Sequence, residues 1–344
     1  MNTPTSHTHT GVAARPIVLQ SNQPTGRFYQ GGGQISQFRS SPPSPPHTPE
    51  DWVASVTSVR NDPGVGMTRL DHGELLADAV TRSPLSWLGP EHVARFGSDT
   101  RLLVKLLDAG QRLPVHAHPD STFAAAFLGA AHGKAEAWYI LEPGTVHLGL
   151  RNDIGRAEVA DIVARQDTVE LLARMHAVEV HRNDTVFVPP GLLHAIGSGV
   201  LLAEVQEPED LSILLEWDGF EIDGSIDGHL GLGFDTAFDA VELTGRSDAD
   251  IESLVRRDVG AGDALADGAA PFFRLDSVLP GNPTTAELPA GFAVLIAVEG
   301  PATLRWNDEA IELVRGMTVL VPFAAGPLRL DGDGRVLVAR PPLP

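Results

Sequence analysis

Two segments of the chain repeat one strand–turn–strand pattern, and this repeat limits the possible folds more than any other feature. Residues 179–189 read EVHRNDTVFVP, and residues 312–322 read ELVRGMTVLVP. A pattern repeated this far along a chain is typical of two copies of one structural unit. The 35 glycines and 27 prolines add the many turns that β-rich folds require. The sequence therefore predicts a mainly β protein built from two related β-barrels.

The length of the chain agrees with this division. A chain of 344 residues fits about two domains of roughly 150 residues each. We expect a disordered tail at 1–15, a first domain at 16–244, a linker at 245–270 and a second barrel at 271–344. The tail is small and polar, and the linker is rich in Asp, Ala and Gly.

Three stretches of the first domain have distinctive patterns. Segments 74–97 and 153–175 carry apolar residues at helical spacing and predict a helical insertion. Segment 27–39, RFYQGGGQISQFR, is a strand candidate interrupted by glycines. Strands there would complete the sheet of either barrel.

Histidines and a glutamate in the first barrel form a candidate metal site. His116 and His118 alternate along LPVHAHPD, so on a strand both side chains point to one face. Glu136 lies in a second strand candidate, and His194 follows a Pro-Pro-Gly turn. Three imidazoles and one carboxylate suit a borderline divalent metal such as zinc. Any one of these histidines alone is more typical of a buried core residue, so the prediction depends on the combination.

The second barrel differs at the matching position. His194 falls opposite Pro327 when the two repeats are aligned. We therefore expect the second barrel to bind no metal.

Three collinear segments carry a family resemblance. KLLDAGQRLPVHAHPD, GKAEAWYIL and VFVPPGLLHAIGSGVLLAEVQ resemble motifs of the class I mannose-6-phosphate isomerases, which are zinc cupins. The likeness extends from about residue 22 to 217 and includes PEDWVASV, and the C-terminal barrel fits the short bacterial form. The resemblance implies two cupin-type jelly-roll barrels, an aldose–ketose isomerase and a monomer.

The resemblance also implies roles for individual residues. The ligands of one Zn²⁺ ion are His116, His118, Glu136 and His194, with His116 in place of the family's usual Gln. Lys134 and Glu204 are implied to be catalytic. Glu204 is a candidate base for the proton transfer through an enediol(ate), and a metal-bound hydroxide or a histidine is the rival. Without the resemblance, Lys134 is more typical of a surface lysine and Glu204 of a solvated glutamate.

Two positions depart from the family pattern on the side that faces the substrate. Leu214 stands where the family has an arginine, and Pro114 stands where it has a serine associated with phosphate. Leucine cannot replace a guanidinium as a phosphate ligand. Lys105 and Arg112, together with Lys134, are candidates to compensate, and we assign Lys105 and Arg112 to substrate binding.

These departures leave several functions open. The first is interconversion of mannose 6-phosphate and fructose 6-phosphate, and the second is isomerisation of a different or non-phosphorylated sugar. A non-catalytic, sugar-binding metal cupin is the third. A dioxygenase is the fourth, because three histidines and one glutamate also hold iron.

Composition excludes other classes of partner. The net charge of −20 argues against nucleic acid, which requires a basic face. No apolar run reaches about 18 residues, so we expect no membrane span. The absence of cysteine excludes disulfides and thiol chemistry. The N-terminus lacks the apolar core of a signal peptide, and we expect a cytoplasmic protein that binds a sugar or sugar phosphate.

Overall fold

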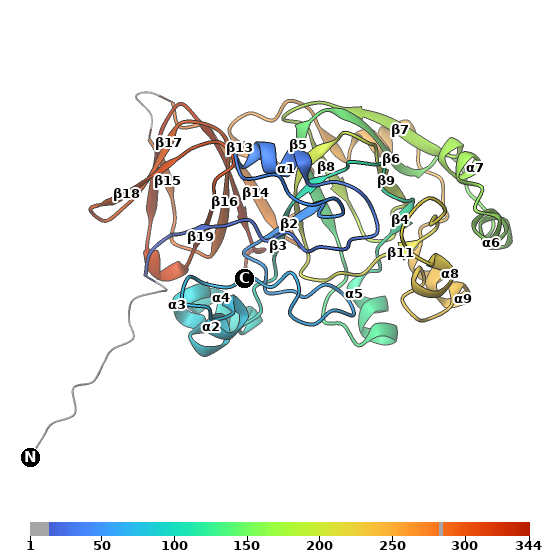
Figure 1. Cartoon of the computed structure of the whole chain (residues 1–344), viewed down its shortest axis with the longest axis horizontal. Helices are drawn as coiled ribbons and strands as arrows, with labels where there is room; N and C mark the ends of the chain where they lie inside the picture. Colours follow the sequence, from blue (N-terminus) through green and yellow to red (C-terminus); the bar gives the residue numbers. More distant parts are fainter. Residues whose placement is uncertain (1–13, 282–284) are drawn as a thin grey trace, which may run out of the picture.

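The computed structural model of the chain describes residues 14–281 and 285–344. Residues 1–13, which make up most of the predicted disordered tail at 1–15, lie outside this part. Two antiparallel β-barrels stand side by side (Figure 1). The prediction of a mainly β fold with two cupin-type barrels is confirmed.

The first barrel consists of two facing sheets. One sheet has the strand order β12 (Val255–Arg256), β8 (Thr185–Val188), β5 (Glu136–Glu142), β10 (Leu201–Gln206), β3 (Leu103–Asp108) and β2 (Glu50–Val53). The other has the order β11 (Ile213–Leu214), β4 (His116–Ala117), β9 (His194–Ile196), β6 (Gly144–Leu150) and β7 (Met175–Val180). Strands β3 and β10 are buried along their whole length, because both of their faces are covered.

The second barrel repeats this arrangement. One sheet has the order β1 (Ile17–Leu19), β19 (Thr318–Val321), β16 (Ala293–Glu299), β21 (Arg335–Arg340), β14 (Arg274–Val278) and β13 (Gly262–Asp263). The facing sheet has the order β15 (Ala286–Leu288), β20 (Leu328–Gly332), β17 (Ala302–Trp306) and β18 (Glu309–Leu313). The N-terminal strand β1 therefore belongs to the C-terminal barrel, where Ile17 pairs with Leu320.

The strand expected within 27–39 is instead helix α1 (Gly33–Phe38). The Asp108 carboxylate, at the end of β3, accepts hydrogen bonds from the backbone N–H groups of Gly32 and Gln34 at 2.8 and 2.9 Å. These bonds satisfy donors that a helix start leaves without partners. The prediction of a strand was wrong because the group that holds the helix start comes from a distant part of the chain.

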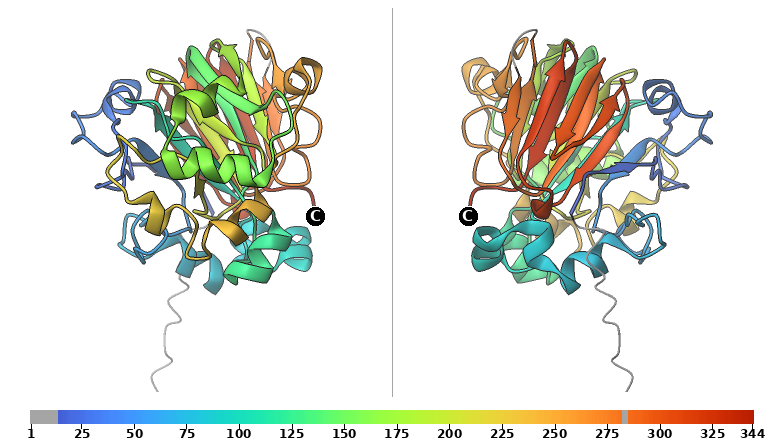
Figure 2. Two further views of the ribbon diagram at one scale, coloured as in Figure 1. Left: turned by 90° about the vertical axis from the view of Figure 1, so that its right-hand side faces the viewer. Right: turned by 90° about the vertical axis from the view of Figure 1, so that its left-hand side faces the viewer.

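The remaining helices lie outside the sheets. Within 74–97 they are α2 (Leu76–Arg82), α3 (Pro84–Leu88) and α4 (Pro90–Phe96), and within 153–175 they are α6 (Arg156–Arg165) and α7 (Thr168–Ala173). Proline occupies the first position of α3 and α4, where it costs no hydrogen bond. Figure 2 shows α6 and α7 on the outer face of the first barrel. Short helical turns complete the chain: α5 (Ser121–Phe123), η1 (Ala124–Leu128), α8 (Gly224–Asp227), α9 (Phe234–Ala237), η2 (Phe238–Ala240), α10 (Asp248–Glu252) and η3 (Phe323–Ala325).

The segment between the barrels is structured. Within 245–270, β12 pairs with β8 of the first barrel and β13 pairs with β14 of the second. The division of the chain at 244 and 271 stays a prediction.

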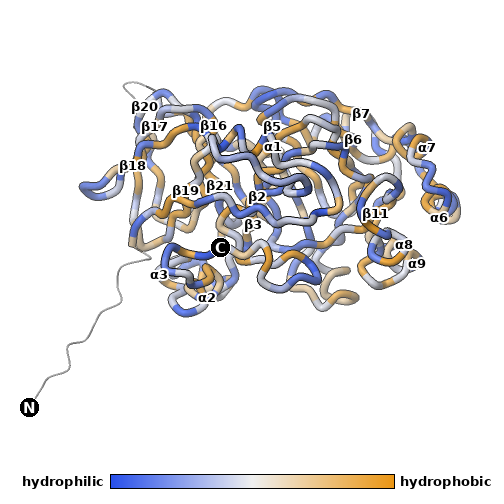
Figure 3. Tube along the Cα trace, in the orientation of Figure 1, coloured by the Kyte–Doolittle hydropathy of each residue, from blue (hydrophilic) through white to orange (hydrophobic). Residues whose placement is uncertain are grey.

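Apolar residues gather on the strands (Figure 3). One core cluster spans both barrels, since it includes Val104 and Tyr139 of the first and Leu275 and Leu337 of the second. In the described residues, helices are too short or too polar to pass through a bilayer.

Candidate functional site

The predicted metal ligands meet inside the first barrel. His116 and His194 are direct partners across β4 and β9, and His118 follows β4 by one residue. The three imidazoles offer ligand atoms that all lie within 4.8 Å of one another. All three side chains are buried, so their polar nitrogens need partners inside the protein.

Backbone carbonyls fix the orientation of each imidazole. Nδ1 lies 2.7 Å from the Pro114 carbonyl in His116, 2.6 Å from that of Leu211 in His118 and 2.8 Å from that of Leu192 in His194. A carbonyl only accepts, so each Nδ1 carries the proton and each Nε2 keeps its lone pair. Nε2 of His118 lies 3.2 Å from Nζ of Lys134, and Nε2 of His194 is buried with no hydrogen-bond partner among residues 14–281 and 285–344. The unpartnered lone pair of His194, beside two further imidazoles, fits a bound metal ion.

The electrostatics of the cluster also suit a metal. Burial, together with the neighbouring His118, lowers the pKa of His194 to about 3. Burial likewise holds the pKa of His116 well below its ordinary value. Neutral imidazoles are the form that binds a metal. This cluster can therefore hold a metal ion at ordinary pH.

Glu136, the fourth predicted ligand, approaches the histidines from the opposite sheet. Its Oε1 lies 2.9 Å from Nε2 of His118, and its Oε2 lies 3.7 Å from Nε2 of His194. Burial opposes ionisation of Glu136, but Lys134 and His118 outweigh it and hold its pKa well below normal. Nζ of Lys134 lies 2.7 Å from Oε1 of Glu136. The three histidines and one carboxylate form a donor set that suits a borderline divalent ion such as zinc.

A cavity of about 570 Å³ opens beside this cluster. His116, Glu136, Lys134, Lys105 and Glu204 all line it. Its remaining lining residues are Arg27, Phe28, Tyr29, Glu50, Arg60, Asn61, Leu107, Leu113, Pro114, Ile196, Asp210, Ser212, Leu214, Ile222, Ile226, Asp227, Leu230 and Gly231. Two predicted metal ligands, His116 and Glu136, thus line the same cavity as the predicted catalytic residues Lys134 and Glu204, and His118 and His194 lie behind them in the histidine cluster.

Glu204 and Lys105 are direct partners across β10 and β3. Nζ of Lys105 lies 3.5 Å from Oε1 of Glu204 and 3.8 Å from Oε1 of Glu50. Burial raises the pKa of Glu204 to about 7, and the nearby Glu136 carboxylate contributes. A carboxylate with a pKa near neutrality is suited to accept and return a proton.

Arg112, the other residue predicted to bind substrate, does not line this cavity. Its guanidinium donates to both carboxylate oxygens of Glu216, with Nη1 at 2.7 Å from Oε2. Glu216 also accepts a hydrogen bond from the backbone N–H of Val115 at 2.9 Å. Arg112 therefore fixes, through Glu216, the position of the backbone immediately before β4.

The two positions that depart from the family pattern do face the cavity. Leu214 pairs with His116 across β11 and β4, and Pro114 supplies the carbonyl that orients the same histidine. The wall next to His116 is therefore apolar where the resemblance has arginine and serine.

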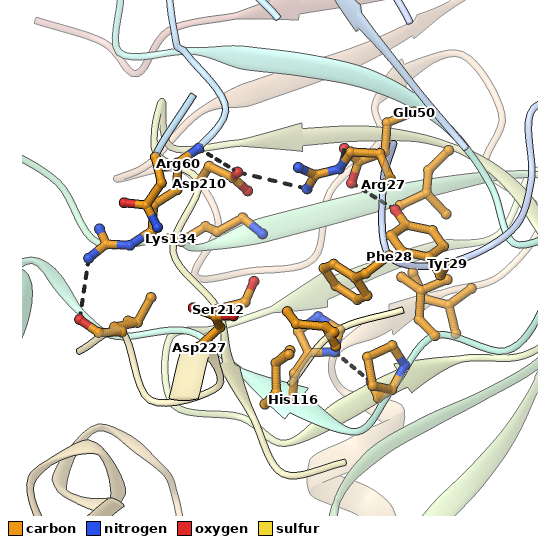
Figure 4. A pocket seen from close by; sticks show the side chains of 18 of the residues that line it. Arg27, Phe28, Tyr29, Glu50, Arg60, His116, Lys134, Asp210, Ser212 and Asp227 are labelled. Atoms are coloured by element: carbon orange, nitrogen blue, oxygen red, sulfur yellow. Dashed lines mark hydrogen bonds and ion pairs between the residues drawn. The ribbon is translucent and has the colours of Figure 1, made fainter. Parts of the chain in front are cut away.

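Several charged residues of the cavity escaped the sequence analysis (Figure 4). Arg27 forms ion pairs with Glu50 at 3.2 Å and with Asp210 at 3.8 Å, and Tyr29 donates to Glu50 at 2.7 Å. Arg60 reaches the cavity from a loop. Of these residues, Glu50 is the one that the sequence could have indicated, because it lies in the PEDWVASV segment that resembles the family.

Comparison with known proteins gives relatives of one kind. No family model matches the chain. Mannose-6-phosphate isomerase ManA of Bacillus subtilis is 24% identical over 248 residues, which is 69% of this chain and 74% of that protein. The mannose-6-phosphate isomerase of Streptococcus mutans is 30% identical over 208 residues, or 57% of this chain and 59% of that protein.

Solved structures agree on the fold. A mannose 6-phosphate isomerase bound with zinc and yttrium superposes with a TM-score of 0.71 at 15% identity and covers 96% of this chain and 99% of that one. The resemblance predicted from the sequence motifs is confirmed by both kinds of comparison.

Proposed function

We propose that this chain, which resembles mannose-6-phosphate isomerases in sequence and fold, is a zinc-dependent aldose–ketose isomerase. Its reaction is the interconversion of mannose 6-phosphate and fructose 6-phosphate through an enediol(ate). The observation that carries the proposal is the convergence of three histidines and the Glu136 carboxylate beside a cavity that His116, Glu136, Lys134 and Glu204 line. One zinc ion per chain is part of the proposal.

The residues of the cavity divide the work of the reaction. When bound, zinc supplies Lewis-acid stabilisation of negative charge on a substrate oxygen. Glu204 accepts the proton from C2 of the aldose, and the electron pair of that bond forms the enediolate. Glu204 then returns the proton to C1. Lys134, fixed beside Glu136, exchanges a proton with the substrate oxygens as their charge shifts from O1 to O2.

One arginine of the cavity, Arg60, supports the proposal of a phosphorylated substrate. Carboxylates already hold the other cations of the cavity, since Arg27 pairs with Glu50, Lys105 with Glu204 and Lys134 with Glu136.

Arg60 is placed differently. Its guanidinium donates to the Leu230 carbonyl at 3.3 Å and has no ion pair with a carboxylate among residues 14–281 and 285–344. Its backbone N–H donates to Asp210 at 3.0 Å, which fixes the loop. Arg60 and His116 lie on different sides of the cavity (Figure 4). A guanidinium there suits a phosphoryl group at the far end of a sugar.

A non-phosphorylated sugar is the second candidate. Leu214 and Pro114 favour it, because they offer no donor to a phosphate on the wall beside His116. The two candidates differ in whether Arg60 contributes to binding.

A panel of sugars tests the proposal. Zinc-loaded protein is incubated in deuterated water with phosphorylated and free hexoses and pentoses, and deuterium incorporation is followed by NMR. We expect exchange at C2 of mannose 6-phosphate and formation of fructose 6-phosphate. Exchange with free mannose in preference to its phosphate supports the second candidate, and exchange with no sugar contradicts the isomerase proposal.

A further inference from the structure

Two arginines lie side by side at one end of the second barrel. Arg274, the first residue of β14, is the direct partner of Arg340, the last residue of β21. Arg340 is two residues beyond Val338, whose side chain belongs to the interior core of this barrel. Residues two apart on a strand share a face, so Arg340 points toward the barrel interior.

These guanidiniums have little to neutralise them. Arg340 is 6% exposed, and its Nη2 donates to the Pro289 carbonyl at 3.0 Å. Arg274 donates from Nε to the Pro341 carbonyl at 2.9 Å. In the described part of the chain, neither guanidinium lies within 4.0 Å of a carboxylate oxygen. Burial lowers the pKa of Arg340, and the charge of Arg274 lowers it further.

One carboxylate faces the pair. Asp276 lies on the same face of β14, and its charge raises the pKa of both arginines, although burial lowers them more. The other buried arginine, Arg335, is differently placed, because it donates to Tyr139 at 3.1 Å, to the Val259 carbonyl at 2.7 Å and to Ser277 at 3.2 Å. A buried and a half-buried cation side by side, with one carboxylate between them, keep an excess positive charge that is costly away from water, so the arginine pair calls for an anion.

A cavity is present where that anion would lie. It has a volume of about 380 Å³ and is lined by Ala261, Gly262, Arg274, Asp276, Ser277, Val278, Leu279, Ala286, Glu287, Leu288, Pro289 and Arg340. A Cβ atom at Gly291 would lie 2.7 Å from Nη1 of Arg340, so glycine leaves room for the guanidinium. Glu287, the other acid of the lining, is paired with Arg329 at 2.7 Å.

The arginine pair lies at the end of the second barrel that corresponds, in the internal repeat, to the end of the first barrel that carries Glu136. Glu136 pairs with Val188 across β5 and β8, and Ala293 pairs with Val321 across β16 and β19. Val188 and Val321 are equivalent in the repeat, so Ala293 takes the place of the ligand Glu136. The next residue along, Val294, pairs with Ala339, the neighbour of Arg340. The second barrel thus lacks this acidic ligand and instead carries two cations at the same end.

We propose that this end of the second barrel is a binding site for a small phosphate-bearing anion, held by Arg274 and Arg340. A guanidinium binds phosphate through two parallel hydrogen bonds, and two guanidiniums opposite the single Asp276 carboxylate leave a positive charge for the anion. The cavity has room for a phosphoryl group with a small substituent. This site is separate from the cavity beside His116 and does not depend on the isomerase proposal.

Inorganic phosphate is the first probe, added to the zinc-loaded full chain. We expect it to raise the Tm of the wild-type protein and of the control Arg305→Gln, which removes an exposed charge from the same barrel. We expect Arg274→Gln and Arg340→Gln to lose most of that rise and to bind phosphate more than about tenfold more weakly in calorimetry. Phosphate that binds beside His116 raises the Tm of the wild type and of the three variants by the same amount, so it does not affect the comparison.

The same variants distinguish binding from a purely structural role. Without phosphate, we expect Arg274→Gln to unfold at no lower temperature than the wild type, because it removes one of two like charges. A titration of the same variants with mannose 6-phosphate then shows whether the arginine pair binds a sugar phosphate more tightly than free phosphate.

Crystals soaked in selenate locate the site directly. We expect an anomalous peak between Arg274 and Arg340. A peak confined to the first barrel, or an equal phosphate-induced Tm rise in wild type and Arg274→Gln, would overturn the proposal.

Discussion

At the scale of single residues, the metal site depends on which nitrogen of each histidine is free. The carbonyls of Pro114, Leu211 and Leu192 hold Nδ1 and leave Nε2 directed at the common centre. These contacts are local for His116 and His194, whose carbonyls lie two residues earlier in the chain. That closeness explains why short strand motifs were enough to predict that these histidines lie together.

We expect His194→Ala to reduce zinc affinity by more than about tenfold, since loss of outer contacts alone costs that much at metal sites. The measurement is the metal content of purified protein by mass spectrometry after dialysis. His116→Gln is the matched variant and should retain zinc, because the resembling family has Gln at this position. Full zinc occupancy in His194→Ala would rule out the proposed ligand set.

Glu204 sets the expected pH dependence. Its pKa of about 7 means that the carboxylate is protonated below that pH and available as a base above it. The isomerisation rate should therefore rise as pH increases through about 7. We expect Glu204→Gln to lose this limb and to lower kcat by about 10²–10⁴-fold while zinc remains bound.

Lys105 provides the control for this assignment. Its charge lowers the pKa of Glu204, so Lys105→Met should move the rising limb of the profile to higher pH. If the pH dependence of the isomerisation rate is the same in the wild type, Lys105→Met and Glu204→Gln, the base is another group.

Arg60 determines the expected preference for a phosphate. Loss of hydrogen bonds to a charged group costs about 1.5–3 kcal/mol, so Arg60→Met should raise KM for mannose 6-phosphate by about 10–100-fold. KM for free mannose should not change. Arg95→Met, an exposed charge outside the cavity, is the matched control. Equal effects on both sugars would show that Arg60 does not bind the phosphate.

At the scale of elements, the strands that carry the ligands were predictable and the N-terminal elements were not. Alternation along LPVHAHPD gave the shared face of His116 and His118 without reference to the rest of the chain. Strand β1 and helix α1 depend on partners far away in sequence, on β19 and at Asp108. Arg27 and Arg60 reach the cavity from loops, whose paths no periodicity describes.

Asp108 tests this view of helix α1. Its carboxylate accepts from the backbone N–H groups of Gly32 and Gln34 and from the Gln34 side chain at 2.9 Å. We expect Asp108→Ala to lower the free energy of unfolding by about 1–3 kcal/mol, because buried donors lose their partner. Urea denaturation measures the change. Asp108→Asn retains an acceptor and should lose less; equal stability of Asp108→Ala and wild type would contradict the assignment.

At the scale of the whole molecule, the two barrels have diverged around one shared core. Arg335 of the second barrel donates to Tyr139 of the first, and the largest apolar cluster includes strands of both. The first barrel encloses a histidine cluster with Glu136, and the second carries an arginine pair at the end that corresponds to Glu136. The internal repeat predicted two barrels, but only the register of β14 and β21 brings Arg274 and Arg340 together.

The zinc site is central to the proposed function, in which the histidine cluster with Glu136 binds zinc and makes the cavity an isomerase site. Titration of metal-free protein with zinc, followed by deuterium exchange into mannose 6-phosphate, tests it most directly. We predict that the exchange rate rises until one zinc ion is bound per chain, and that His194→Ala shows no rise. Exchange that is unaffected by zinc, or absent at full zinc occupancy, would contradict the claim.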